Sequence, residues 1–260
     1  MPVEIQVDFL KIYDTAARGI RRAAVFLGLG VNSSESEHLT DYHLSRHTKF
    51  HILPEHVSVD VLSEWKKEYR MWVVGCGFRE LVDRFCVFLD QLHHVSCLIG
   101  RRYSQKAQTD FEWLGLDKKI EKLKSEFGIT YVFDAQLASF YPVRNCFVHR
   151  LGRVGPSDLK GGAFLRLRFM RLSSVFTGSS GIPQKIPDIF DPLSSPFITP
   201  EEGSLGLQWS EETLDFRENE WVALTPKHLT EILFFADLCA RQFTKSAIDY
   251  GRSKGLVIRE

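Results

Sequence analysis

The chain has 260 residues, a length typical of one domain with elaborations, and its 44% apolar and 12% aromatic residues exclude wholesale disorder. Its 33 basic and 33 acidic residues give a formal net charge of zero, which argues against extended phosphate tracking but not against a local basic patch. Five cysteines without a C-x-x-C pair predict reduced thiols. No signal-like apolar run and no membrane-length apolar segment occur, so we expect a cytoplasmic protein.

The N-terminal part combines predicted helices with less regular segments. Apolar residues at helical spacing predict a helix over residues 4–29. The Ser- and Glu-rich composition of residues 32–42 predicts a loop. A second helix is expected from about residue 38 to residue 53, where Pro54 stops it. Residues 57–72 begin with the alternation typical of a strand and then pass into a helix.

The middle of the chain carries the strongest helical pattern. Residues 72–99 have a broad apolar stripe, and residues 116–129 repeat apolar residues on one helical face. A further helix is predicted over residues 134–152, in which Pro142 either introduces a kink or begins a second half. The stripe of the first helix consists of Phe78, Leu81, Val82, Phe85, Phe88, Leu89 and Leu92.

The C-terminal part has a different residue pattern, with alternating and proline-rich segments in place of helical spacing. Residues 163–169 alternate apolar residues with arginines, which predicts a half-exposed strand. Residues 178–206 contain five prolines and predict a long loop, and residues 205–224 are expected to supply one or two more strands. A last helix should begin with Thr225 as its N-cap and Pro226 at its first position. Its expected buried face consists of Phe235, Cys239 and Phe243.

The stretch RNCFVHR places three polar groups near the end of an otherwise apolar helix. Asn145 and His149 are four residues apart and therefore share a face, and the long Arg144 side chain can bend toward it. In the last turn the helix dipole favours a protonated imidazole. A histidine can transfer protons and an arginine can neutralise charge on phosphate oxygens, so the spacing indicates phosphate chemistry.

Charges are unevenly distributed around this motif. Residues 141–175 hold seven basic residues and a single acid, Asp158, whereas residues 185–220 hold nine acids and two basic residues. A basic block around the histidine would concentrate an anionic substrate there although the chain is neutral overall. The alternative is that these charges form the solvated face of a strand and its turns. The basic residues are Arg144, Arg150, Arg153, Lys160, Arg166, Arg168 and Arg171.

Over residues 70–155 the chain resembles the HEPN superfamily (higher eukaryotes and prokaryotes nucleotide-binding domain). The signature of that family is an Arg followed, after four to six residues, by a His, commonly with a polar residue next to the Arg; here these are Arg144, His149 and Asn145. The long amphipathic helix and the short charged helix before the motif also fit the antiparallel helical bundle of the family. The resemblance implies an antiparallel helical bundle for this part of the chain. Together with the patterns outside it, we expect a mainly α fold, a HEPN-like bundle with an N-terminal helical extension and a small β appendage, α+β overall.

What the resemblance implies about activity is a metal-independent endoribonuclease that needs no cofactor. In such enzymes the 2′-OH of the RNA attacks the adjacent phosphate and leaves a cyclic 2′,3′-phosphate and a free 5′-OH. His149 would act as general base or acid, Arg144 would stabilise the charge on phosphorus, and Asn145 would orient the histidine or the phosphate. Arg150, Arg153, Arg101 and Arg102 are the candidate residues for RNA binding.

The resemblance also carries expectations about partners and organisation. Family members commonly dimerise so that two motifs form one cleft, which predicts a homodimer, and many act in toxin–antitoxin or antiviral defence systems, which predicts an antitoxin or other regulatory protein as partner. We expect four parts: an N-terminal helical extension (residues 1–69), the HEPN-like core (70–155), a β and loop appendage (156–222) and a C-terminal helix packed on the core (223–260).

Three alternatives to a ribonuclease remain open. The first is a HEPN module that dimerises or binds RNA, a nucleotide or a protein without cleaving RNA. The second is that Arg144 and His149 are structural residues, an arginine paired with a carboxylate and a histidine that caps the helix. The third is a metal-dependent hydrolase that uses His43, His47 and His51, which would share a helical face. Cys146 is interpreted as a packed thiol rather than a nucleophile.

Overall fold

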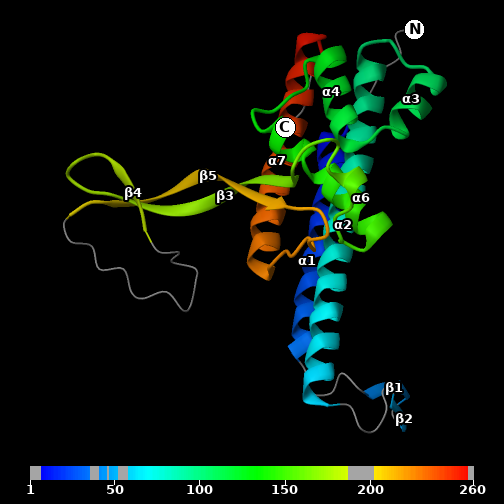
Figure 1. Ribbon diagram of the computed structural model, residues 1–260. Helices are drawn as coiled ribbons and strands as arrows, with labels where there is room; N and C mark the ends of the chain where they lie inside the picture. The colour runs from blue at the N-terminus through cyan, green and yellow to red at the C-terminus, as the bar shows by residue number, and fades with distance from the viewer. Residues whose placement is uncertain (1–6, 36–40, 46, 52–57, 187–201, 257–260) are drawn as a thin grey trace.

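The computed structural model describes residues 7–35, 41–45, 47–51, 58–186 and 202–256. Three long helices lie side by side along most of the body: α1 (Phe9–Glu35), α2 (Val59–Ile99) and α7 (Pro226–Ser253) (Figure 1). The shorter helices α3 (Gln105–Glu112), α4 (Leu116–Phe127) and α6 (Phe140–Arg150) pack against α2, and α5 (Asp134–Ala138) joins α4 to α6. A 3₁₀ turn, η1 (Pro156–Asp158), follows α6.

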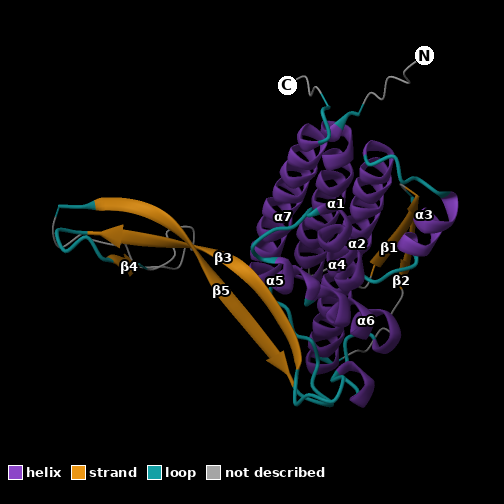
Figure 2. Ribbon diagram, turned by 90° about the horizontal axis from the view of Figure 1, so that it is seen from above, coloured by secondary structure: helices purple, strands orange, loops and turns teal. Residues whose placement is uncertain are grey.

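Two small antiparallel sheets accompany the helices. Strands β1 (Asp41–Ser45) and β2 (Thr48–His51) form a hairpin at the far end of the α1–α2 pair. Strands β3 (Leu165–Thr177), β4 (Pro183–Lys185) and β5 (Ser204–Phe216) form a sheet in the order β4-β3-β5. The register of β3 on β5 runs from the pair Leu165–Phe216 to the pair Thr177–Ser204. This twisted ribbon projects away from the helices (Figures 1 and 2).

One hydrophobic core joins nearly all of these elements. It extends from Phe9 on α1 through the stripe of α2 to Phe243 on α7, and Leu167 and Phe169 attach the base of β3 to it. Helix α1 contributes to the same core as α2 and α7, and the expected boundary between residues 69 and 70 falls inside α2. None of the described helices combines the length and apolarity needed to cross a membrane.

Several sequence predictions are confirmed. The protein is mainly helical with a small β appendage. Helix α4 ends at Gly128 in a left-handed conformation, and α7 begins at Pro226 after the N-cap Thr225, whose hydroxyl accepts the backbone N–H of His228 at 3.1 Å. The expected buried face of α7 is fully buried at Phe235, Cys239 and Phe243.

Pro142 lies in the first turn of a second helix rather than inside one continuous helix. The expected helix over residues 134–152 is interrupted at Ser139 and divides into α5 and α6. Pro142 lies in the first turn of α6, where a backbone N–H has no partner within the helix, so its missing donor costs no helical hydrogen bond.

Three predictions about the N-terminal half are wrong. Residues 41–51 form the β1–β2 hairpin instead of a helix, and its turn is closed by a hydrogen bond from the Ser45 hydroxyl to the Thr48 hydroxyl at 3.1 Å. The strand-like start of residues 57–72 is helical, because Ser58 caps α2 by accepting the N–H of Val61 at 3.4 Å. Helix α1 continues to Glu35 and β1 begins at Asp41, so the described ends of the predicted loop over residues 32–42 are helix and strand; residues 36–40, and residues 187–201 of the predicted proline-rich loop, lie outside the described residues.

Candidate active site

Helix α6 is held against α2 by the ring of Phe147. The ring lies against Gly75 of α2: a Cβ atom added to Gly75 would be 2.6 Å from Cδ1 of Phe147. The ring is also close to that of Phe78, and the two ring centroids are 5.9 Å apart. The helix then ends with Leu151 and Gly152 in the left-handed region, at φ 55° and 92°. The Gly152 N–H donates to the Cys146 carbonyl at 3.2 Å and so closes this end. The predicted motif is therefore fixed on a short helix that crosses α2 closely.

Arg144 is anchored by a carboxylate of α2. Its Nε and Nη2 atoms lie 2.8 Å and 2.7 Å from Oδ1 of Asp83, and its Nη1 donates to Oδ1 of Asn145 at 3.1 Å. The Arg144 side chain is 24% exposed. A guanidinium has five N–H donors, and the contacts within the described part of the chain use three of them. The remaining two, one on each Nη, are available to a phosphate oxygen.

His149 lies on the outer side of α6. Asn145 and His149 are each two residues from Phe147, so the helical repeat places both on the face opposite the one that packs on α2. The His149 side chain is exposed and makes no hydrogen bond or ion pair with any residue that the structure describes. The structure therefore joins Arg144 to Asn145 directly and leaves the imidazole one turn further on, open to solvent.

The four arginines predicted to bind RNA do not form one patch. Arg150 donates to the Ser157 hydroxyl at 2.9 Å and pairs with Asp158 at 3.3 Å, so it fastens the turn after α6. Arg153 is exposed, and its backbone forms an isolated bridge with Trp221. Arg101 and Arg102 follow the C-terminus of α2, which lies about 24 Å along that helix from Asp83 at 1.5 Å per residue.

The basic block of residues 141–175 is largely neutralised within the chain. Strand β5 brings acids opposite the arginines of β3: Arg166 pairs with Asp215 at 2.6 Å and Arg168 with Glu211 at 2.7 Å. Hydrogen bonds from these arginines lower the pKa values of both carboxyl groups. The interpretation as a solvated strand face is correct for Arg166 and Arg168, and the expected focusing of an anion by this block is not supported.

The metal site expected on one helical face does not form, whereas the interpretation of Cys146 as a packed thiol agrees with the structure. His43 and His51 belong to paired strands rather than one helical face, His47 is exposed in the turn between them, and no group of three or more metal-binding side chains occurs among the described residues. The Cys146 thiol is fully buried, and burial raises its pKa to about 12, so it is a packed thiol and not a nucleophile.

The Gly75–Phe147 contact gives a direct test of how α6 is positioned. Gly75→Ala should lower the free energy of unfolding by about 1–3 kcal/mol, because the new methyl group overlaps the Phe147 ring. Gly28→Ala on α1 is the matched control: nothing lies within 4 Å of its new Cβ, so it should stabilise the helix by about 0.5–1 kcal/mol. Urea unfolding of both variants measures the difference. Equal effects would show that Phe147 is not confined at this crossing.

Asp83 is the site residue that the sequence did not indicate. It lies 61 positions before Arg144, within the apolar helix pattern of α2, and only the crossing of α6 brings the two together. An arginine that is oriented by a carboxylate, hydrogen-bonded to an amide and followed one turn later by an exposed imidazole can bind an oxyanion and exchange a proton with it. Comparisons of the chain with protein-family models, with curated proteins and with solved structures found no match.

Proposed function

We propose that the protein is a metal-independent endoribonuclease of the HEPN type, with Arg144, Asn145 and His149 as its catalytic residues. The observation that carries the proposal is the fixed orientation of Arg144, which Asp83 and Asn145 hold through three of its five N–H donors while its side chain stays partly exposed. A preorganised cation of this kind stabilises charge that develops during a reaction without having to reorient.

In the proposed reaction the 2′-oxygen of a ribose loses its proton and forms a bond to the adjacent phosphorus. The bond from phosphorus to the 5′-oxygen of the next nucleotide breaks, and that oxygen takes up a proton. The products are a cyclic 2′,3′-phosphate and a free 5′-OH. His149 transfers one of the two protons, and a second copy of the motif from another chain transfers the other, so the proposal includes a homodimer. A strand free of helical constraint is the expected substrate, because in-line attack needs a flexible nucleotide.

The alternative is a domain with the same architecture that binds RNA or a partner without cleaving. The observation that favours it is the Arg144–Asp83 pair, which is also what a structural arginine would form. The two proposals differ in one outcome, the release of a cyclic phosphate.

The test uses a labelled single-stranded RNA with and without EDTA. Cleavage should survive EDTA, fail on an RNA with a single 2′-deoxy substitution at the cut, and fall at least about a hundredfold in His149→Ala, the scale of a lost acid–base group. His47→Ala is the control, because His47 is also exposed but lies in the β1–β2 turn. RNA binding without cleavage would select the non-catalytic domain. Cleavage abolished by EDTA and indifferent to His149→Ala would refute the ribonuclease proposal.

A further inference from the structure

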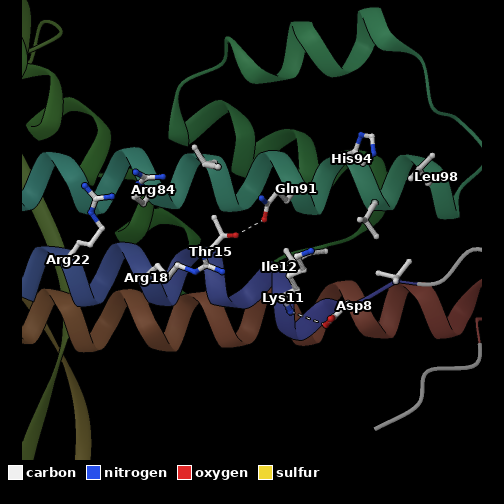
Figure 3. A pocket seen from close by; sticks show the side chains of 13 residues that line it. Asp8, Lys11, Ile12, Thr15, Arg18, Arg22, Arg84, Gln91, His94 and Leu98 are labelled. Atoms are coloured by element: carbon white, nitrogen blue, oxygen red, sulfur yellow. Dashed lines mark hydrogen bonds between the residues drawn. The ribbon is translucent and has the colours of Figure 1, made fainter.

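A groove of about 700 Å³ runs along the seam between α1 and α2 (Figure 3). Its apolar floor includes Ile12, Val87 and Val95, and polar groups of Thr15, Gln91 and His94 line its length. The Thr15 hydroxyl donates to the Gln91 amide oxygen at 2.8 Å across the seam. The charged residues of the lining are Lys11, Arg18, Arg22, Arg84 and Asp8.

Positive charge exceeds negative charge along this groove. Glu80 is shared by Arg22 and Arg84, at 3.0 Å and 3.1 Å. Asp14 is likewise shared by two arginines, Arg18 at 2.5 Å and Arg21 at 3.0 Å. Each cluster of two guanidinium groups and one carboxylate therefore retains one positive charge. The carboxylates also hold the arginines in place, although the side chains of the α1 arginines Arg18 and Arg22 remain more than half exposed.

One end of the groove lies next in the sequence to the residue that anchors the candidate active site. Arg84 at one end directly follows Asp83, the residue that anchors Arg144. Leu98 at the other end lies three residues before Arg101. Arg84 and Leu98 are 14 positions apart, which corresponds to about 21 Å of helix. This length accommodates about six nucleotides at the 3.4 Å phosphate spacing of a helically stacked strand, and fewer nucleotides of an extended strand.

An aromatic pair lies at the end of the groove that is distant from Arg144. His94 contacts the edge of Tyr103 with ring centroids 5.0 Å apart, and Tyr103 is 41% exposed. Proteins that bind single strands combine a basic groove for the phosphates with aromatic rings on which bases stack. An acidic protein segment would use the positive charges but not the exposed aromatic ring, so the combination favours a nucleic acid.

We propose that the α1–α2 groove binds the single-stranded RNA substrate, with its phosphates along Lys11, Arg18, Arg22 and Arg84 and a base on Tyr103. The identity of the ligand rests on the proposed ribonuclease function. The strand reaches Arg144 at the Arg84 end of the groove. The groove, rather than the arginines of β3, then supplies the electrostatic attraction for the substrate.

Binding is tested separately from cleavage, on the His149→Ala background, by fluorescence anisotropy of a labelled single-stranded RNA at a series of salt concentrations. Adding Lys11→Ala and Arg18→Ala should reduce the slope of log affinity against log salt by about 1.4, because each lost phosphate contact to a single strand is worth about 0.7. If the variant and its parent bind equally at 1 M salt, this change of slope makes the variant bind about 65-fold more weakly than its parent at 50 mM salt. Tyr103→Leu should weaken binding about tenfold without changing the slope.

The matched control is Arg241→Ala with Lys245→Ala on α7. Arg241 is paired with Asp237 at 2.7 Å, as Arg18 is with Asp14, and Arg241 and Lys245 are exposed and outside the groove lining. The control should retain the full slope, and so should the charge-preserving pair Lys11→Arg with Arg18→Lys. An equal slope in the groove variant and the control would overturn the proposal. Competition by polyglutamate as strong as that of RNA would also overturn it, in favour of an acidic protein partner.

The two proposals fail in different ways. If the unsubstituted protein binds RNA through the groove but releases no cyclic phosphate, the ribonuclease is refuted and the groove stands. If the unsubstituted protein cleaves RNA, and the groove variant binds RNA with the same salt dependence as its parent, the ribonuclease stands and the groove is refuted.

Discussion

Arg144→Ala is expected to slow RNA cleavage by about a hundredfold to a thousandfold, the usual effect of removing one preorganised donor from a developing oxyanion. The unfolding free energy should fall by only about 1 kcal/mol, because the Arg144–Asp83 pair is partly exposed and Asp83, at 42% exposed, stays hydrated without its partner. Single-turnover cleavage and urea unfolding measure the two effects on the same preparation.

Two further variants separate charge from geometry at this position. Arg144→Lys keeps the positive charge but loses the planar fork that reaches Asp83 and Asn145 together, so it should recover little of the lost rate. Arg150→Ala removes an arginine of the same helix that is bound to Ser157 and Asp158, and its rate should change by no more than a few-fold. Full activity in Arg144→Ala would mean that Arg144 is structural.

Lys119→Met should destabilise the fold by about 3–5 kcal/mol, the largest effect we expect from a single substitution. Lys119 is almost completely buried on α4. Its ammonium group pairs with Asp90 of α2 and donates to the carbonyls of Phe111 and Glu112, both at 3.0 Å, at the C-terminus of α3. Removing one partner of a buried pair leaves an uncompensated charge. Lys119→Met combined with Asp90→Leu should therefore recover much of the loss.

The deficit of Lys119→Met should also depend on pH, with a defined sign. Burial raises the pKa of Asp90 above its ordinary value of 3.8, and the hydrogen bond from Lys119 opposes that rise. Without Lys119 the pKa of Asp90 should rise further, so the folded variant takes up a proton more readily than the unfolded chain. Its deficit relative to wild type should thus shrink as the pH falls from 7 toward 4. A deficit that grows on acidification would contradict this account of the pair.

Elements with local signals were predictable from the sequence. Thr225 and Pro226 define the start of α7, and Gly128 defines the end of α4, through contacts within a few residues. A helix ending before Pro54 is expected over the segment that forms the β1–β2 hairpin, with His43, His47 and His51 on one face of it, whereas the structure pairs His43 with Lys49 across two strands. Periodicity over a short polar segment does not decide between a helix and a strand.

Features that depend on distant partners were not predictable. The spacing of Arg144, Asn145 and His149 can be read in the sequence. The role of Asp83, which orients the arginine, depends on the crossing of α6 over α2 and cannot be read there. The arginines of β3 looked like a basic patch, since their acidic partners on β5 lie more than 40 residues later. Lys119 would be assigned to the solvent by its charge, and only the packing of α2, α3 and α4 explains its burial.

The arginine–carboxylate pairs of β3 and β5 have a consequence for how the chain folds. Leu165, Leu167 and Phe169 face the core while Arg166 and Arg168 face Asp215 and Glu211. Slipping one strand by a single residue would turn the apolar set to water and the arginines toward the core. Burial of the apolar face on the helices and pairing of the arginines with the acids of β5 therefore favour the same register of the two strands, so a mispaired ribbon would lose both kinds of stabilisation at once.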